Sequence, residues 1–366
     1  MRIREVRTYS ELVAIKDEWK NALERCEHSV FSTWEWLSTW WKHFGGNKQL
    51  LVLVAEENDR IVGIAPLMYS VQTIFGLRQG MIQFIGSSHS DYNDFIMTDK
   101  NKDWKKLFFD HINNLSENWS ILELTDIPEN GNSIPLLRKI SNSIRPLYQC
   151  HYSILPKSYD ALLSSLKRKY RRGLERNLRR LDKDGFKVHL VDYSETQKID
   201  DGMNTLFALH QKRWEQKGFS STFSDLNFRN FNLEIARLFS EEGWLGLYSL
   251  ELSGKPAAIL YGFKYKDKYY AYIQGIDPTY LKYSIGNLLL LYVMNKCIQD
   301  QLTQFDMLRG AENYKKRWNT MTKWNFEAIV ARNRTFGGFG YSMYRKFWSE
   351  NERLRWFLSK LVKMDN

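Results

Sequence analysis

The chain has 366 residues, which is enough for two domains, and 43% of them are hydrophobic, which argues against a disordered protein. Its 53 Lys and Arg against 42 Asp and Glu give a net charge of +11. This charge favours phosphate-bearing ligands, nucleic acid or an anionic membrane surface, with a merely soluble basic surface as the alternative. The longest apolar run is shorter than the roughly 20 residues that span a bilayer.

Three scattered cysteines argue against a disulfide framework and a zinc site. The N-terminal residues carry charges throughout and have no apolar segment of the kind found in secretion signals. We therefore expect a cytoplasmic protein, and the positive charge leaves open a peripheral position at the inner face of the membrane.

The first well-marked helix is predicted over Phe31–Gly46, which reads FSTWEWLSTWWKHFGG. Ser32 and Glu35 have the spacing of a capping box at its start, and Gly45 and Gly46 provide a stop at its end. The tryptophans between them are predicted to lie in the core.

Two β-hairpins are predicted, one in each half of the chain. In the first, strand-like runs flank the polar turn Glu57–Arg60, and in the second, similar runs flank the turn Ser253–Lys255. Shifting the sequence by 195 residues superimposes these turns and places Gly63 over Ala258. This weak repeat predicts that one architecture is used twice.

A single amphipathic helix is predicted over residues 158–184, between the two halves. Nine Lys or Arg residues lie between Lys167 and Lys183, against only Glu175 and Asp182. A solvated helix face explains any one of these charges, whereas nine together favour a phosphate-rich partner. The apolar residues recur every three or four positions and form one stripe: Leu163, Leu166, Tyr170, Leu174, Leu178 and Leu181.

After its hairpin, the second half continues with a strand at residues 268–275, a helix from about 285 to 300 and a strand over 304–310. The polar segment AENYKKRWN, a strand at 323–333 and an amphipathic helix near Tyr341–Lys363 complete the chain. Strands that alternate with helices on one sheet predict a mixed α/β or α+β domain.

The sequence contains no P-loop, no HExxH zinc motif and no GxSxG elbow, so metal, P-loop and serine-hydrolase chemistry are not favoured. The stretch YLKYSIGN has Ser284 and Gly286 at the start of a leucine-rich helix. Backbone N–H groups and the helix dipole can bind a pyrophosphate there, and Gly286 allows close approach. Gly and Ser also begin many helices that bind no ligand.

The succession of a strand, YLKYSIGN, a helix, FDMLRG and ENYKKRW resembles the acyl-CoA-binding half of the GNAT acyltransferases. In that family a Q/R-x-x-G-x-G/A loop holds the CoA pyrophosphate. It aligns with Leu281–Gly286, where Leu281 replaces the first polar residue and Ser284 the first glycine. The resemblance implies a donor site of six residues: Lys282, Tyr283, Ser284, Ile285, Gly286 and Asn287.

A fuller pattern resembles the CelD-like acetyltransferases, which are associated with cellulose and exopolysaccharide biosynthesis. It comprises FSTWEWLSTWW, RIVGIAPLMY, SHSDYNDFI, SLKRKYRRGLERNLRRL, LHQKRWEQKGF, YSIGNLLLL and FDMLRGAENYKKRW, in this order. This group is similar to the Fem-type aminoacyl transferases, which carry two GNAT-like domains. The resemblance implies an α+β fold of tandem GNAT-like domains, each with a mostly antiparallel central sheet flanked by helices.

We place the N-terminal domain at residues 1–155 and the catalytic domain at residues 156–366, which include the basic helix 158–184 and the C-terminal helix. GNAT chemistry needs groups that orient or deprotonate an amine and return a proton to the leaving thiolate. Asp306, on the strand QFDML, is predicted to orient or deprotonate the nucleophile, or else is a polar strand-end residue.

The resemblance implies that Tyr314 is the general acid toward sulfur, with a packed aromatic as the alternative. It also implies that Lys315 stabilises phosphate or oxyanion charge, with a solvated turn lysine as the alternative. His210 and Arg213 lie three residues apart on one helix and share a face. His210 is an alternative base or a hydrogen-bonded structural residue, and Arg213 is predicted to bind substrate.

Asp91, Tyr92 and Asp94 of the loop SDYND match a family motif and are predicted to bind the acceptor. The alternative is that the Asp side chains cap turns, as Asx residues in such loops more often do.

Together these features predict an N-acyltransferase with acyl-CoA, such as acetyl-CoA, as co-substrate and no metal. The acceptor would be an amino group of a sugar, an amino acid or a cell-surface polymer precursor. One alternative is a Fem-like transferase whose donor is aminoacyl-tRNA, and another is a non-catalytic scaffold of polysaccharide biosynthesis. The basic helix at residues 167–183 predicts tRNA or an anionic membrane surface as a partner.

Overall fold

A computed structural model describes residues 1–74, 76–99, 103–141 and 143–332. These residues fall into two compact units. Unit 1 comprises Met1–Tyr148 and the residues from Trp324 onward, and unit 2 comprises Gln149–Lys323. The helix predicted near residues 341–363 lies outside the described residues.

Unit 1 alternates short helices with long strands. In chain order it contains β1 (Arg2–Val6), α1 (Tyr9–Ala14), α2 (Lys16–Glu24), η1 (Val30–Ser32), α3 (Trp34–Phe44), β2 (Gln49–Glu57), β3 (Arg60–Ile74), β4 (Leu77–Phe84), β5 (Ile96–Met97), η2 (Lys105–Phe109), α4 (Asp110–Asn113), β6 (Trp119–Pro128) and α5 (Ile134–Ile140). Two strands run from one unit into the other: β7 (Ser143–Ile154) and β13 (Met321–Ala331).

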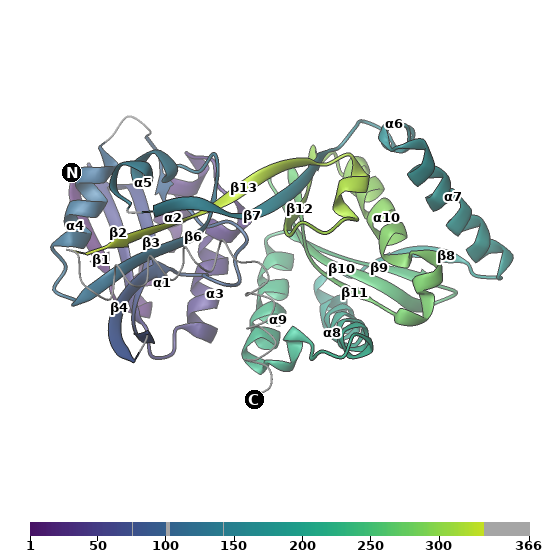
Figure 1. The fold of residues 1–366 in the computed structure, drawn as a ribbon, viewed down its shortest axis with the longest axis horizontal. Helices are drawn as coiled ribbons and strands as arrows, with labels where there is room; N and C mark the ends of the chain where they lie inside the picture. Colours follow the sequence, from purple (N-terminus) through teal and green to yellow (C-terminus); the bar gives the residue numbers. More distant parts are fainter. Residues whose placement is uncertain (75, 100–102, 142, 333–366) are drawn as a thin grey trace. The chain divides into compact units, whose positions relative to one another are not determined.

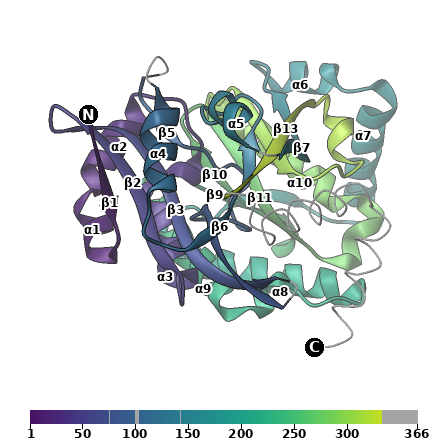
Figure 2. The same ribbon diagram turned by 60° about the vertical axis from the view of Figure 1, so that its left-hand side comes forward.

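The sheet of unit 1 has the strand order β1-β2-β3-β4-β6-β13, with β5 beside β3. Neighbouring strands are antiparallel except for the parallel pair β4 and β6. Figure 2 shows α1 and α2 on one side of β2 and β3 and α4 on the other. Because both faces are covered, the strand residues Leu50–Ala55 are all buried.

Unit 2 begins with a pair of helices and then builds its own sheet. In chain order it contains α6 (Tyr159–Ser165), α7 (Arg168–Lys183), β8 (Val188–Asp192), η3 (Thr196–Lys198), α8 (Ile199–Gln216), η4 (Thr222–Ser224), α9 (Leu226–Glu241), β9 (Leu245–Leu252), β10 (Lys255–Tyr265), β11 (Lys268–Ile276), η5 (Pro278–Tyr283), α10 (Ile285–Gln299), β12 (Gln304–Arg309) and η6 (Lys315–Trp318).

The sheet of unit 2 has the order β7-β12-β11-β10-β9-β8, and only β11 and β12 form a parallel pair among these described strands. The helices α8 and α9 cover one face and α10 covers the other (Figure 1). The leucine run Leu288–Leu291 of α10 is buried all round, because α6 and α7 pack over the side of α10 that faces away from the sheet.

The two units repeat one pattern of strand pairing, with three antiparallel pairs, a parallel pair and a final antiparallel pair. The hairpins β2–β3 and β9–β10 turn at Asn58–Asp59 and at Ser253–Gly254, and all four residues have φ between 50° and 80°. These angles are typical of type I′ hairpin turns. Both predicted hairpins and the predicted repeat are confirmed.

In each unit, the strand at one end of the order given above belongs to a longer strand that begins in the other unit. β7 leaves unit 1 at Tyr148, and its residues Cys150–Ile154 pair with β12 of unit 2. β13 leaves unit 2 at Lys323, and its residues Asn325–Ala331 pair with β6 of unit 1. Unit 1 therefore depends on a strand that follows unit 2 in the sequence.

Side chains fasten β13 to unit 1. Arg145 and Glu327 form a buried ion pair, and the side-chain amide of Asn325 donates to the backbone oxygen of Asp91 at 2.6 Å. A buried Arg–Glu pair is strongly disrupted when one partner is removed, because the remaining charge is left in the core. These contacts hold the last strand in place.

The helix predicted to begin at Phe31 begins instead at Trp34, and its cap is Thr33 rather than Ser32. Glu35 does not close a capping box: its side chain is buried and lies 2.9 Å from the ammonium of Lys20. The capping-box prediction used only the spacing of neighbouring residues. In the structure, the Glu35 carboxylate instead pairs with Lys20, which is 15 positions away. The predicted glycine stop is confirmed.

The single helix predicted over residues 158–184 is two helices. α6 ends at Ser165, whose hydroxyl donates to the backbone oxygen of Leu162 at 2.7 Å, and α7 begins at Arg168. Between them Leu166 is extended, with ψ of 145°, and buried. The serine competes with the helical hydrogen bonds, and the break turns Leu166 into the core. The predicted apolar stripe is confirmed by its packing in the core of unit 2.

Candidate active site

The two parallel strands of unit 2 diverge. β11 and β12 pair only where Lys268–Tyr270 lies beside Gln304–Asp306, and both strands continue beyond this point. β12 also bulges, because Leu308 has a left-handed φ of 58° and the register with β7 shifts there. Beyond the third residue pair, β11 and β12 are therefore not paired with each other through their backbones.

The helix α10 begins just beyond the end of β11. Its N-cap, Ser284, has the left-handed angles φ 53° and ψ 43°, and its side chain caps no backbone group. The amides of Ile285 and Gly286 have no acceptor among the residues described. Two amides at the positive end of the helix dipole form a site that favours an anion.

Gly286 has a packing role that differs from the predicted close approach of a phosphate. A Cβ atom at this position would lie 2.7 Å from Cδ1 of Ile276 and 3.3 Å from Oε1 of Gln274. The side-chain amide of Gln274 also donates to the backbone oxygen of Gly286 at 3.1 Å. The glycine is therefore required for the packing of α10 on the end of β11.

Two of the six predicted donor-site side chains belong to the core. Ile285 is fully buried, and Tyr283 is buried and donates its hydroxyl hydrogen to the carboxylate of Asp184. This hydrogen bond lowers the pKa of Asp184. The predicted residues whose side chains are at least partly exposed are Lys282, Ser284 and Asn287.

Asp306 lies where β11 and β12 diverge, and it is fully buried. Its Oδ2 lies 2.8 Å from the ammonium of Lys323, and its Oδ1 accepts from the amide of Leu308 at 2.9 Å. The carboxylate thus neutralises a lysine and holds the bulge of β12. The structure brings Asp306 to the candidate site as part of its framework.

Lys315 ties the segment after β12 to the bulge. Its ammonium donates to the backbone oxygens of Arg309 at 2.7 Å and Leu308 at 3.3 Å, and lies 3.0 Å from the carboxylate of Glu312. Burial raises the pKa of the neighbouring Tyr314. The phenol therefore keeps its proton at neutral pH, as a general acid must.

His210 has both ring nitrogens engaged. Nδ1 lies 2.8 Å from the hydroxyl of Ser221, and Nε2 accepts from the indole of Trp214 at 2.9 Å. Burial lowers the pKa of His210 to about 4. Both contacts of His210 are with residues of unit 2, and Arg213, one turn further on, donates to the side chain of Gln216.

In unit 1, Asp94 fastens the loop that precedes α5. Its carboxylate accepts from the amides of Phe95 at 2.9 Å, Asn132 at 2.5 Å and Ser133 at 2.9 Å. Burial raises its pKa against the effect of these hydrogen bonds. This matches the capping alternative stated for the loop.

Asp91 and Tyr92 are also buried within unit 1. The backbone oxygen of Asp91 accepts from Asn325, and the ring of Tyr92 meets the edge of Phe31 with centroids 6.0 Å apart. The three residues of the SDYND loop thus belong to unit 1, whereas Asp306, Tyr314, Lys315 and His210 belong to unit 2.

A histidine that the sequence patterns do not single out lies beside the bulge. His151, on β7, is 1% exposed and lies between the residues that pair with Asp306 and Arg309. Its Nδ1 is 3.3 Å from the hydroxyls of Thr320 and Thr322, and its Nε2 is buried without a partner in the part of the chain that is described. The sequence offered one signal for this residue, namely a histidine at a position of β7 whose side chain faces the core.

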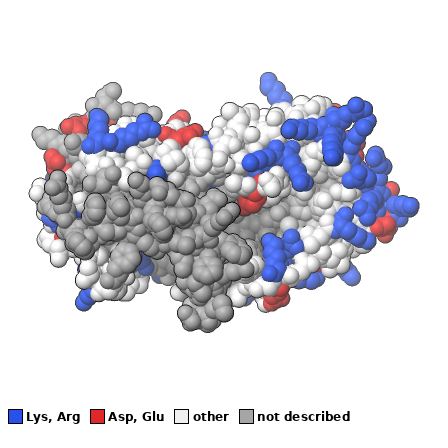
Figure 3. All heavy atoms as spheres, viewed as in Figure 1, with Lys and Arg blue, Asp and Glu red and all other residues white. Residues whose placement is uncertain are grey.

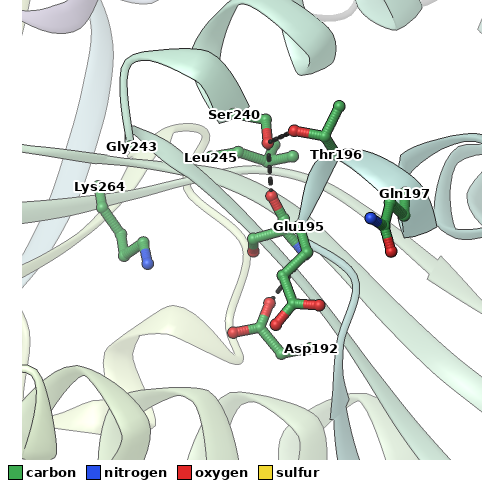
Figure 4. Close-up of a pocket in the computed structure, with 9 residues that line it drawn as sticks. Asp192, Glu195, Thr196, Gln197, Ser240, Gly243, Leu245 and Lys264 are labelled. Carbon is green, nitrogen blue, oxygen red and sulfur yellow. Dashed lines mark hydrogen bonds between the residues drawn. The ribbon is translucent and has the colours of Figure 1, made fainter.

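A polar pocket of about 530 Å³ lies elsewhere in unit 2 (Figure 4). Ser240 donates to the backbone oxygen of Ser194 at 2.7 Å and lies 3.3 Å from the hydroxyl of Thr196, so these hydroxyls satisfy one another. The pocket is near the start of β11, because Lys264 pairs with Tyr269, whereas α10 follows the end of β11. It is lined by Asp192, Ser194, Glu195, Thr196, Gln197, Ser240, Gly243, Leu245 and Lys264.

Basic side chains gather over α7 (Figure 3). The opposite face of this helix buries Leu174 and Leu181, and the guanidinium of Arg180 donates to the backbone oxygen of Lys282 at 3.4 Å. The basic helix therefore contacts the stretch that precedes α10. Seven cations of α7 are exposed and form no ion pair with any described residue: Arg168, Lys169, Arg172, Arg176, Arg179, Arg180 and Lys183.

Among the described residues, no group of three or more His, Cys, Asp or Glu side chains is arranged to hold a metal ion. Within the same ranges, every helix is too short or too polar to span a bilayer. No disulfide joins any two of Cys26, Cys150 and Cys297.

A comparison with known protein families finds a match for the central part of the chain. Residues 168–316 match the family described as "Acetyltransferase (GNAT) domain". This range runs from α7 into η6 and includes the diverging strands and α10. These residues are therefore similar to a GNAT acetyltransferase domain. No curated protein matches the sequence.

Solved structures share the fold over most of the chain. FemX superimposes with a TM-score of 0.61 at 13% identity, over 90% of this chain and 98% of that chain. A conserved protein of unknown function from Bacteroides thetaiotaomicron gives 0.58 at 11%, over 91% and 100%. L-PGS from Bacillus licheniformis gives 0.54 at 12%, over 90% and 95%. At such identities the likeness shows the fold alone, and the predicted α+β fold of GNAT-like domains is confirmed.

Proposed function

We propose that the chain is an N-acyltransferase that moves an acyl group from acyl-CoA, such as acetyl-CoA, to an amino group. The observation that carries this proposal is the start of α10 beside the diverging strands β11 and β12, within the residues that match the GNAT acetyltransferase domain. The amides of Ile285 and Gly286 would bind the pyrophosphate, and the exposed Lys282 would add positive charge. The thioester arm would then extend between the strands.

The proposed roles of the remaining residues follow from their contacts. Asp306 and Lys315 hold the backbone of the bulge, which orients the reacting groups. Tyr314 returns a proton to the leaving thiolate. His210, with both nitrogens engaged, holds α8 to the segment that follows it.

The acceptor in this proposal is an amine on a sugar, an amino acid or a surface-polymer precursor. Acceptor binding by Asp91, Tyr92, Asp94 and Arg213 stays a prediction, and so does the CelD-like assignment with its role in polysaccharide biosynthesis. Thiol release from acetyl-CoA in the presence of a panel of amines tests the reaction class and excludes the scaffold alternative if it is observed.

A matched pair of variants tests the donor site. Asn287 lies in the first turn of α10 and Asn295 near its end, and both are partly exposed. Asn287→Asp places a carboxylate at the positive end of the helix, where it stabilises the helix but repels phosphate. We expect it to weaken acetyl-CoA binding by about tenfold, or 1.4 kcal/mol, in calorimetric titrations.

Asn295→Asp adds the same charge away from the site and should bind acetyl-CoA like the wild type. A wild-type protein that neither binds acetyl-CoA nor releases thiol with any amine would contradict the proposal. Equal affinities of the two variants would show that the donor does not bind at the start of α10.

A second candidate, a Fem-like transferase with an aminoacyl-tRNA donor, is favoured by the unpaired cations of α7. Binding to nucleic acid phosphates releases counterions, and the slope of log affinity against log salt is about −0.9 for each phosphate neutralised on a duplex. Replacing Arg172, Arg176 and Arg179 with Gln should reduce this slope by about three and leave acetyl-CoA binding unchanged. Absence of tRNA binding at low salt would exclude this candidate. Anionic vesicles in place of tRNA test the predicted membrane partner.

A further inference from the structure

Buried polar atoms without partners cluster around one segment of unit 2. Nε2 of His151, Nε1 of Trp318 and the hydroxyl of Tyr170 are all buried and have no hydrogen-bond partner in the described part of the chain. The rings of Tyr170 and Trp318 meet edge to face at 5.3 Å, and Ser153 donates to the backbone oxygen of Trp318 at 3.0 Å. Because buried polar groups are normally satisfied in folded proteins, these three atoms call for partners, and a bound substrate could supply one.

Strand alternation places His151 on the α10 side of the sheet. Ser153 pairs with Phe305, whose ring stacks on Tyr269 at 5.1 Å in the core beneath α10. His151 is two residues from Ser153 and therefore points to the same face. Across from it, β12 bulges at Leu308. The imidazole thus lies on the face that carries α10, beside the point where β12 leaves β11.

The hydroxyls of Thr320 and Thr322 both lie 3.3 Å from Nδ1 of His151. The Thr320 hydroxyl donates to the backbone oxygen of Lys315 at 3.3 Å, so its oxygen can accept a proton from Nδ1. With the proton on Nδ1, Nε2 keeps its lone pair for a ligand. Burial lowers the pKa of His151, and the charges of Lys315 and Lys316 lower it further against the opposing effect of Glu312. The ring is therefore neutral at neutral pH.

We propose that Nε2 of His151 is the general base that takes the proton from the acceptor amine. This inference rests on the acyltransferase function proposed above. In the step, the amine nitrogen forms a bond to the thioester carbonyl carbon, and the carbon–sulfur bond breaks with its electron pair on sulfur. His151 takes one proton from the nitrogen, and the thiolate takes one from Tyr314. Both side chains then return to their starting states by exchange with solvent.

The test separates Nε2 from the rest of the ring. His151→Asn keeps a polar group near the position of Nδ1, where Thr320 lies, and removes Nε2. We expect kcat for thiol release to fall by about 10²–10⁴, with the KM for acetyl-CoA and the melting temperature unchanged. The acidic limb of the kcat/KM profile against pH should disappear. His189→Asn, at an exposed histidine on β8, should change none of these.

The possible outcomes separate this inference from the proposed function. An active wild type whose rate and pH profile survive in His151→Asn overturns the role of His151 and leaves the acyltransferase proposal standing. A wild type that releases no thiol from acyl-CoA overturns both. If His151→Asn does not fold, His151→Ala with added imidazole decides: partial recovery of the rate supports the base, and a folded variant without recovery overturns it.

Discussion

Ser284 occupies a backbone conformation that strains any residue with a side chain. Left-handed angles cost a non-glycine residue about 1–2 kcal/mol, and the hydroxyl of Ser284 offsets none of this, because it caps no amide. Glycine, which stands at the aligned position in the GNAT loop, adopts these angles freely. Ser284→Gly is therefore expected to raise the free energy of unfolding by about 1 kcal/mol.

Denaturant titration measures this change, and Ser284→Ala serves as the control. Alanine keeps the Cβ atom and the strain, so its effect should stay within about 0.5 kcal/mol. A glycine variant that is less stable than the wild type would show that the serine side chain makes a contribution which its contacts do not reveal.

The buried pair of Asp306 and Lys323 makes a second residue-scale prediction. Asp306 is fully buried, whereas the Lys323 side chain is 20% exposed. Lys323→Met removes the ammonium that neutralises this buried carboxylate and is expected to cost about 3–5 kcal/mol. Combining it with Asp306→Asn should cost less than the sum of the single changes, since the double variant buries no carboxylate charge there. Additive costs in urea unfolding would mean that the two groups do not interact.

His210 predicts a loss of stability in acid. Its unfolded pKa is near 6.5, and its folded pKa is about 4. As the pH falls between these values, the unfolded state takes up a proton that the folded state does not, so the free energy of unfolding falls. Between pH 7 and pH 5 this should amount to up to about 2 kcal/mol. His210→Gln should flatten this part of the stability profile, and His189→Gln should not.

Comparing the two histidines shows what sequence patterns reveal about the site. The sequence shows that His210 is a histidine on a predicted helix. It does not show the two hydrogen bonds of the ring, one of which is to a residue 11 positions away. The two hydroxyl partners of His151 are 169 and 171 positions away, and no local pattern indicates them. Residue types and elements were predictable, whereas partners that depend on tertiary packing were not.

At the scale of the element, α7 places its charges against its own dipole. Its first turn has no acidic residue and no side-chain cap, and it carries cations where the helix end is already positive. Lys169→Glu is therefore expected to raise the free energy of unfolding by about 0.5–1 kcal/mol. Lys183→Glu, in the last turn, should lower it by a similar amount. Melting temperatures at low salt check both variants, and a fall for Lys169→Glu with a rise for Lys183→Glu would contradict the dipole argument.

Turn chemistry and apolar periodicity account for the elements that the sequence predicted well. The hairpin turns carry Asn, Asp, Ser and Gly where φ is positive, and α10 is a leucine run after a glycine. The break at Leu166 was not predictable, because the helical periodicity continues through it and only a serine hydroxyl and core packing interrupt it.

At the scale of the whole molecule, the positions of β7 and β13 in the sequence predict that fragments of the two units differ in their ability to fold alone. Residues 149–323 contain β8 to β12 and the residues of β7 that pair with β12, whereas residues 1–148 lack β13. The second fragment should unfold cooperatively on its own. The first should not, because β6 would present an unpaired edge and Arg145 would lose Glu327.

Circular dichroism melts of the two fragments test this asymmetry. A peptide of residues 321–332, added to the first fragment, should restore a cooperative transition. A fragment of residues 1–148 that melts as sharply as the full chain would show that β13 is dispensable. The repeat and the fold class were open to prediction, but the strand pattern of β13 does not say which sheet it joins.

The late position of β13 bears on how a ribosome makes this protein. Domains usually finish folding in the order in which they are synthesised. Here the closing strand of the first unit is translated after all of the second unit. The nascent N-terminal half must therefore remain incomplete while the later half folds, and the protein matures in the reverse of its order of synthesis.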